Sequence, residues 1–207
     1  MKKFIAILLV LVIGLFAFTA CNKDDNDSTG DYGDYKPVEK FDGDKLKETW
    51  SSGEITFANK NKILLPCTID EFLNASGLRF TNEQAYANKQ FKPGESFTIP
   101  LVGTDTQIKI DCQNLGSSAC GYLDTTVVGF SFFNSAKGNR AITVAAGLTV
   151  GITRADVEEA LGIPEGKTSE DRLYTYRVEL ENKEAIRLNV SFNSSGVVNS
   201  ISYDLDK

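Results

Sequence analysis

Apolar and polar residues alternate with a period of two along several short segments from residue 97 onward. In one of them, Ile108 and Ile110 alternate with Lys109 and Asp111. A period of two with one polar side predicts antiparallel strands that are covered on one face only. Six such strands are expected, at residues 97–101, 107–112, 126–133, 173–180, 185–192 and 197–205.

Two other segments carry the pattern of a short helix. Thr68 is followed three residues later by Glu71, and Thr153 is followed three residues later by Asp156. A threonine and an acid at this spacing predict a capping box, in which each side chain bonds the backbone N–H of the other residue. Each segment then ends at a glycine, which is typical of a helix end. Two helices are therefore expected, at residues 68–77 and 153–162.

The order of these segments predicts an α+β fold. Each helix precedes three strands, and a hairpin with strands at 55–58 and 62–65 precedes the first helix. A helix that lies on one face of an antiparallel sheet buries the apolar side of every strand. The sequence thus predicts two tandem helix-on-antiparallel-sheet (α-β-β-β) units, at residues 54–140 and 141–207.

The first residues contain the three parts of an export signal. Lys2 and Lys3 form a positive start, residues 5–18 form an apolar run, and Thr19 and Ala20 form a cleavage point of small residues. The run is shorter than the ~20 apolar residues that a membrane-spanning helix needs. We expect residues 1–20 to be a signal peptide that is removed, with an uncleaved anchor helix as the alternative.

The segment Phe18-Thr19-Ala20-Cys21 resembles the lipobox of bacterial lipoproteins. The resemblance implies that a lipid is attached to Cys21, which becomes the first residue of the mature chain. Two or three acyl chains hold a protein durably on a membrane, whereas one holds it weakly. We therefore expect a lipid-anchored protein of the cell envelope that faces outside the cytoplasm. The alternative is an ordinary secretory signal, in which Cys21 only follows the cut.

Residues 21–53 are predicted to be an acidic, flexible tether. Asp, Gly and Pro crowd it, and little apolar surface is available for burial before Phe41. The run from Asp25 to Gly30 resembles the opening of an EF-hand calcium loop. Lys36 stands where that loop requires a bidentate Glu, however, so a solvated linker and no metal site are expected.

The composition of the chain excludes several kinds of catalytic site, metal site and partner. The sequence contains no histidine, which excludes Ser-His-Asp and Cys-His catalysis and every His-ligated metal site. The formal net charge is −6, and no basic patch stands out, so nucleic acid is not an expected partner. Removal of Lys2 and Lys3 with the signal leaves 20 basic and 28 acidic residues, a net charge of −8. No cofactor is expected.

Three cysteines remain besides Cys21. Cys112 and Cys120 are eight residues apart, across a Gly-Ser-rich bend, and form the candidate disulfide. Free, buried thiols that pack as small apolar residues are the equal alternative for all three. Cys67 has no basic neighbour in sequence that would lower its pKa, so it is not expected to be a nucleophile.

The segment from Gly147 to Tyr203 resembles the SmpA/OmlA lipoproteins, which are associated with outer-membrane β-barrel assembly. The resemblance rests on Gly147-Leu148-Thr149-Val150-Gly151-Ile152-Thr153, Val157, Leu161-Gly162-Ile163-Pro164, Tyr174, Tyr176, and the hairpin from Phe192 to Ile201. Two such units side by side are similar to the β-lactamase inhibitory protein. These resemblances imply a non-enzymatic, protein-binding domain outside the cytoplasm, and they carry over no binding residue.

The leading hypothesis is therefore a lipid-anchored, non-enzymatic module that binds an envelope protein or ligand. It predicts a sheet or an inter-unit groove with exposed aromatic or apolar surface, for which Tyr174 and Tyr176 are candidates if they are not core residues.

An envelope inhibitor of a hydrolase is the first alternative. A carboxylate-based enzyme is the second, and its candidate pairs are Glu158 with Glu159 and Glu179 with Glu181.

Overall fold

The computed structural model describes residues 40–43, 54–164, 166–168, 172–179 and 184–206. The expected signal peptide, Cys21, and the tether apart from residues 40–43 lie outside these ranges. Within the described ranges, no helix has the length and apolar character needed to cross a bilayer.

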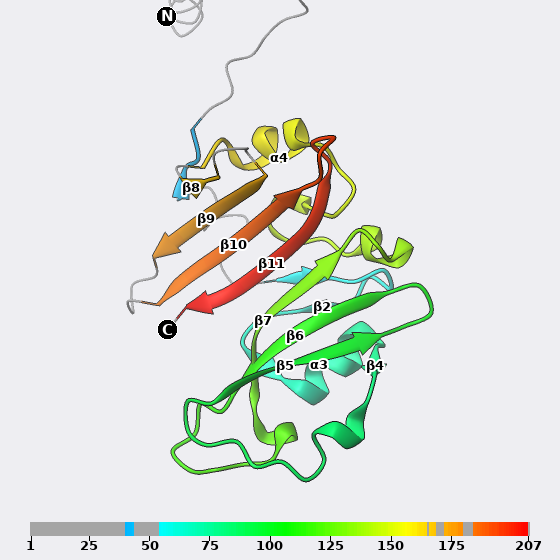
Figure 1. Ribbon diagram of the computed structural model, residues 1–207, viewed down its shortest axis with the longest axis vertical. Helices are drawn as coiled ribbons and strands as arrows, with labels where there is room; N and C mark the ends of the chain where they lie inside the picture. Colours follow the sequence, from blue (N-terminus) through cyan, green and yellow to red (C-terminus); the bar gives the residue numbers. More distant parts are fainter. Residues whose placement is uncertain (1–39, 44–53, 165, 169–171, 180–183, 207) are drawn as a thin grey trace, which may run out of the picture. The chain divides into compact units, whose positions relative to one another are not determined.

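A nine-stranded sheet dominates the described chain and confirms the α+β class (Figure 1). Its order is β4-β5-β6-β7-β11-β10-β9-β8, and β3 also pairs with β7. All of its pairings are antiparallel. The strands are β3 (Cys67–Thr68), β4 (Arg79–Phe80), β5 (Ser96–Val102), β6 (Gln107–Gln113), β7 (Thr126–Phe133), β8 (Gly166–Lys167), β9 (Leu173–Glu179), β10 (Ala185–Phe192) and β11 (Val198–Asp206).

The two expected helices are present as α3 (Ile69–Ser76) and α4 (Arg154–Leu161), and both expected capping boxes form. In α3 the Glu71 N–H donates to Thr68 Oγ1 at 3.2 Å, and the Thr68 N–H donates to Glu71 Oε2 at 2.8 Å. Gly77 ends α3 in the left-handed conformation, with φ 68°. Local sequence therefore sets where both helices begin, and packing of their apolar faces supplies most of their stability.

The core lies between the helices and one face of the sheet. Ile69 and Phe72 of α3 and Val157 and Leu161 of α4 are buried. The strand residues that pack against these helices belong to the apolar side of each strand, as the period-two alternation predicts. The largest fully buried side chains include Tyr174, Tyr176, Tyr203, Phe130 and Phe132.

The predicted hairpin is present in a shorter form. Strands β1 (Ile55–Thr56) and β2 (Lys62–Ile63) make a separate two-stranded sheet. No sequence pattern predicts the two-residue strands β3, β4 and β8, because a strand of that length has no periodicity to detect.

Residues 40–43, which lie within the predicted tether of residues 21–53, pack against the folded chain. The Phe41 N–H donates to Ile163 O at 2.9 Å, and the Phe41 ring meets the Tyr176 ring edge-on at 5.0 Å. Tyr176 in turn donates from its hydroxyl to Gly162 O at 3.0 Å. This docking point is therefore on the helix side of the sheet.

Candidate binding surface

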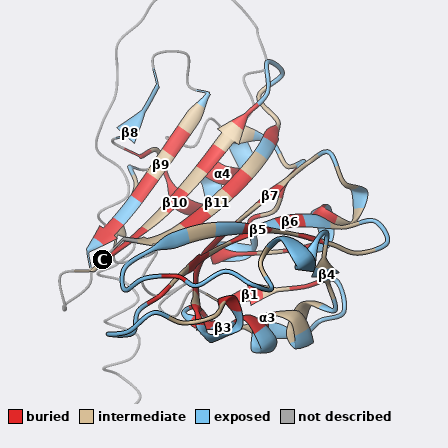
Figure 2. Ribbon diagram, turned by 60° about the horizontal axis from the view of Figure 1, so that its bottom comes forward, coloured by how far each residue is buried: buried red, intermediate tan, exposed pale blue. Residues whose placement is uncertain are grey.

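The two faces of the sheet differ in cover. Helix α3 and strand β2 lie behind the strands in Figure 1, and the front of the sheet is uncovered by the described residues. Helix α4 packs on the same side as the buried Tyr174, whose hydroxyl donates to Glu158. Figure 2 shows buried residues alternating with more exposed ones along β9, β10 and β11, as expected for strands that are covered on one face only. We call the uncovered side the open face.

The strand register arranges the open face in rows that cross six strands, from β5 to β9. The charged row carries two acids on β6 and β11 and two arginines on β10 and β9. Its members, in spatial order, are Thr98, Asp111, Gly129, Asp204, Arg187 and Arg177.

The next two rows consist mostly of small polar side chains. The middle row is Pro100, Lys109, Ser131, Ser202, Asn189 and Thr175. The third row begins with Val102 and Gln107 and continues with Phe133, Ser200, Ser191 and Leu173.

Hydrogen bonds between neighbouring strands link these small side chains. Thr175 Oγ1 donates to Asn189 Oδ1 at 2.9 Å, and Asn189 Nδ2 donates to Ser202 Oγ at 3.4 Å. The hydroxyls of Ser191 and Ser200 are also bonded to each other. Side chains that bond across strands are held in place, so the open face is ordered before any partner binds.

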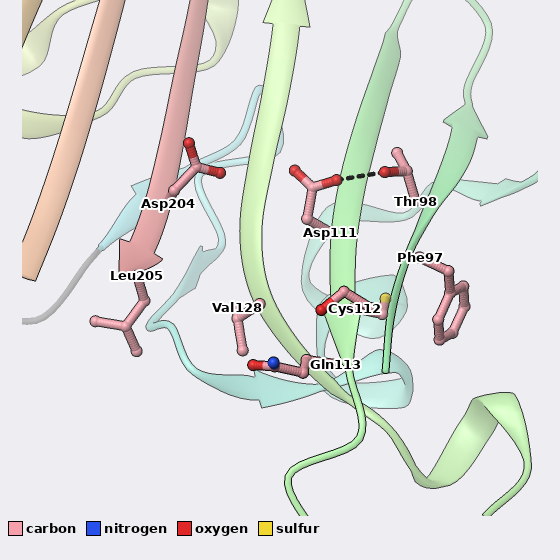
Figure 3. Close-up of a pocket in the computed structure, with 9 residues that line it drawn as sticks. Phe97, Thr98, Asp111, Cys112, Gln113, Val128, Asp204 and Leu205 are labelled. Atoms are coloured by element: carbon pink, nitrogen blue, oxygen red, sulfur yellow. Dashed lines mark hydrogen bonds between the residues drawn. The ribbon is translucent and has the colours of Figure 1, made fainter. Parts of the chain in front are cut away.

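A shallow cavity of about 410 Å³ opens at the acidic end of the charged row (Figure 3). Asp111 and Asp204 lie on either side of β7, at the level of Gly129. Thr98 Oγ1 donates to Asp111 Oδ1 at 2.6 Å. A Cβ at Gly129 would lie 2.7 Å from Tyr203 O and 3.1 Å from Asp204 Oδ1, so only glycine fits between the two strands here.

The surface chemistry differs from the expectation of exposed aromatic or apolar side chains. Most residues of the open face are hydroxyl, amide or charged. Tyr174 and Tyr176 point to the covered face and are 1% and 0% exposed, so they are core residues. Apolar side chains occur on the open face mainly in the third row, where Phe133 and Leu173 are half-buried.

Of the three cysteines, Cys112 lies beside the shallow cavity of the open face, but its side chain is buried. Cys67, Cys112 and Cys120 are free thiols, so the candidate Cys112–Cys120 disulfide is not formed in the structure. Burial raises the pKa of the Cys67 thiol to about 12, and the nearby Glu71 charge adds to the shift. Burial also raises the pKa of Cys112 to about 12. Both match the alternative of buried thiols that act as small apolar residues.

Two of the four carboxylates named as catalytic candidates, Glu158 and Glu179, are held in local contacts. Glu158 accepts a hydrogen bond from the Tyr174 hydroxyl, while its neighbour Glu159 is exposed. Glu179 pairs with Arg177 at 2.9 Å on an exposed site. Glu181 lies outside the described residues. The structure thus does not bring Glu158 and Glu159 into one site.

Comparisons with known proteins give no relative. No protein-family model, no curated protein and no solved structure matches the chain.

Proposed function

We propose that this protein is a lipid-anchored, non-enzymatic binding module of the cell envelope, and that the open face of its sheet contacts a protein partner. The observation that carries the proposal is the asymmetry of the sheet, which has helices on one side and the ordered, mostly polar open face on the other. A large, rigid and uncovered face suits binding, because little conformational entropy is lost when it meets a partner.

A mostly polar face is compatible with protein binding. Interfaces between proteins that also exist separately are, as a whole, about as apolar as the rest of a protein surface. The open face supplies hydrogen-bonding groups from Ser131, Ser202 and Asn189 in the middle row, with apolar side chains at its third row. Its charges lie at defined positions, which favours a partner with matching charges.

The fold is further proposed to consist of two tandem α-β-β-β units. Helix α3 precedes β5, β6 and β7, and helix α4 precedes β9, β10 and β11. Pairing of β7 with β11 then joins the two sets of strands in one sheet. The open face therefore draws on both proposed units.

The anchor is proposed to leave this face accessible. From Cys21 to Lys40 the chain has 19 peptide steps (40 − 21), which span at most ~65 Å when extended. The chain then joins the folded part on the helix side, through Phe41 and Tyr176. A tether attached there does not have to cross the open face to reach the membrane.

The test uses the full lipoprotein, purified from its own membrane with whatever it has bound. Ser202→Arg places a long cation in the middle of the open face, and Ala155→Arg places the same side chain on an exposed site of α4. We expect the specific co-purifying proteins to be lost from the Ser202 variant and retained by the Ala155 variant. Equal recovery from both variants would place the binding site elsewhere and refute the proposal.

A hydrolase inhibitor is the specific alternative, and the continuous sheet built from two helix-led sets of strands supports it. Incubation with envelope proteases and β-lactamases tests it directly. If the wild-type protein inhibits one of these enzymes and Ser202→Arg does not, the partner is a hydrolase. Full activity of every enzyme in the presence of the protein would remove this alternative.

A further inference from the structure

The open face has an ordered distribution of charge. Along the charged row, Asp111 and Asp204 occupy β6 and β11, and the positions beyond them on β10 and β9 are Arg187 and Arg177. Lys109 belongs to the next row, where its ammonium lies 5.5 Å from the centre of the Phe133 ring. Read from β5 towards β9, the charged row therefore changes from negative to positive.

A row with this order of charges is complementary in charge to the same row of a second copy that runs in the opposite direction. Consider a two-fold axis parallel to the strands that lies above the junction of β7 and β11. Rotation about it places a second open face on the first and keeps each row over itself, with β6 over β10 and β7 over β11. Asp111 of each copy then lies over Arg187 of the second copy. An isologous contact requires this self-complementarity.

The other rows match under the same rotation. In the middle row, Ser131 on β7 falls over Ser202 of the second copy, so small side chains meet where the two sheets are closest. In the third row, Val102 on β5 falls over Leu173 on β9 of the second copy, which pairs two apolar side chains at the margin. None of the three described rows places a charge over a charge of the same sign.

We propose that a second copy of this chain occupies the open face, in a face-to-face pair whose two-fold axis follows β7 and β11. The proposal rests on the function proposed above and names the partner. Arg187 already has an interaction within its own chain and lies opposite Asp204. Its guanidinium carries five N–H donors in a fork, so one side chain can keep its interaction within its own chain and also bind the incoming Asp111.

The area is sufficient for a specific, reversible pair. Strands are ~4.8 Å apart and side chains on one face repeat every ~6.7 Å, so six strands by three rows cover roughly 600 Å² per copy. The pair would bury about 1,200 Å² in total, which is at the lower end of specific protein interfaces. Two lipid anchors in one membrane add to this by confining both copies to the same layer.

The experiment measures self-association by co-capture of two differently tagged copies of the full lipoprotein, expressed together and solubilised from the membrane. The wild-type copies are expected to co-purify. Asp111→Arg in both copies, or Arg187→Asp in both copies, replaces two attractive contacts by two repulsive ones and should reduce co-capture at least tenfold. Ala155→Arg on α4 is the matched control and should leave co-capture unchanged.

The decisive arm co-expresses one Asp111→Arg copy with one Arg187→Asp copy. Both cross-contacts are then attractive again, and co-capture should return to near the wild-type level. A misfolded variant could not produce this recovery. Absence of wild-type co-capture, or absence of recovery in the mixed pair, overturns the proposal. If other envelope proteins are still lost with Ser202→Arg in that case, the open face binds a different partner and the proposed function stands.

Discussion

Asp111 on β6 and Arg187 on β10 face the same side of the sheet in one row, separated only by Gly129 on β7 and Asp204 on β11. The row exists because β7 pairs with β11, two strands that are far apart in the sequence. Either set of strands alone would present only one end of the row. The candidate binding surface is thus a property of the joined sheet.

Gly129→Ala should lower the free energy of unfolding by about 2 kcal/mol, because the added methyl group has no room between β7 and β11. The new Cβ would lie 2.7 Å from the Tyr203 carbonyl oxygen, and backbone cannot yield as a flexible side chain can. Urea unfolding of the wild type and the variant measures the difference. Ser131→Ala, on the same strand and at a half-buried site, is the control. Equal midpoints for the two variants would show that the strands separate easily at this point.

Asn139→Ala should also destabilise the fold, by roughly 2–4 kcal/mol, because it leaves three backbone groups without their bonds. Asn139 is 0% exposed, accepts from the Gln107 N–H at 3.0 Å, and donates to the carbonyls of Gln107 and Phe133 at 2.6 and 2.8 Å. Asn134→Ala, at a half-buried site nearby, should cost much less. Thermal unfolding of both variants gives the comparison, and a loss at Asn139 no greater than at Asn134 would contradict it.

The capping boxes predict a specific dependence on pH. Hydrogen bonds from the Thr68 backbone N–H and hydroxyl lower the pKa of Glu71 below its ordinary value of 4.5. Because the folded pKa is the lower one, the charged carboxylate stabilises the fold above 4.5, and this contribution disappears as the pH falls through the folded value. Glu71→Gln should therefore be less stable than the wild type at neutral pH, and the two should converge in acid.

The same argument applies to α4. The Thr153 hydroxyl and backbone N–H lower the pKa of Asp156, so Asp156→Asn should show the same convergence in acid. Glu159→Gln, on an exposed site of α4, is the control. Urea midpoints measured across the acidic range give the comparison. A constant difference between wild type and Glu71→Gln at every pH would show that the carboxylate charge is not what stabilises the cap.

The helices and strands could be predicted because local interactions determine them. Thr68 and Glu71 are three residues apart, and the alternation that predicts β6 is complete within Gln107–Gln113. The joining of β7 to β11 depends on contacts between distant segments, and no local pattern carries that information. The rows of the open face follow from that pairing and from the register, so the charged row could not be located from sequence.

Buried tyrosines show a second limit of prediction. Alternation assigns Tyr174 and Tyr176 to one side of a strand, but it does not say whether that side is covered. Their hydroxyls find partners at Glu158 and at Gly162 O, which allows these polar groups to be buried in the core. From the sequence alone, both residues are candidates for the binding surface. The contacts of the two hydroxyls with α4 and its following loop show that this side of the strand is covered.

Cysteine reactivity should divide the thiols into two classes. Burial raises the pKa values of Cys67 and Cys112 to about 12, so at pH 8 about one molecule in 10⁴ carries the reactive thiolate at either site. Cys120 is half-buried and should be alkylated first by iodoacetamide. Peptide mass spectrometry should find Cys67 and Cys112 modified only after unfolding. A Cys112–Cys120 disulfide would instead protect both residues until a reductant is added.

The lipid anchor remains a prediction from the sequence, and labelling tests it. Cells grown with an alkyne analogue of palmitate should incorporate the label into the wild-type protein, because the lipobox resemblance assigns acyl chains to Cys21. Cys21→Ala should remove the label, and Cys120→Ala should retain it, since both variants lose one cysteine but only the first loses the attachment site. The amino-terminal peptide of the wild type should begin at residue 21. Label that persists in Cys21→Ala, or a mature chain that begins at another residue, would refute the anchor and remove the membrane confinement that favours pairing of two copies.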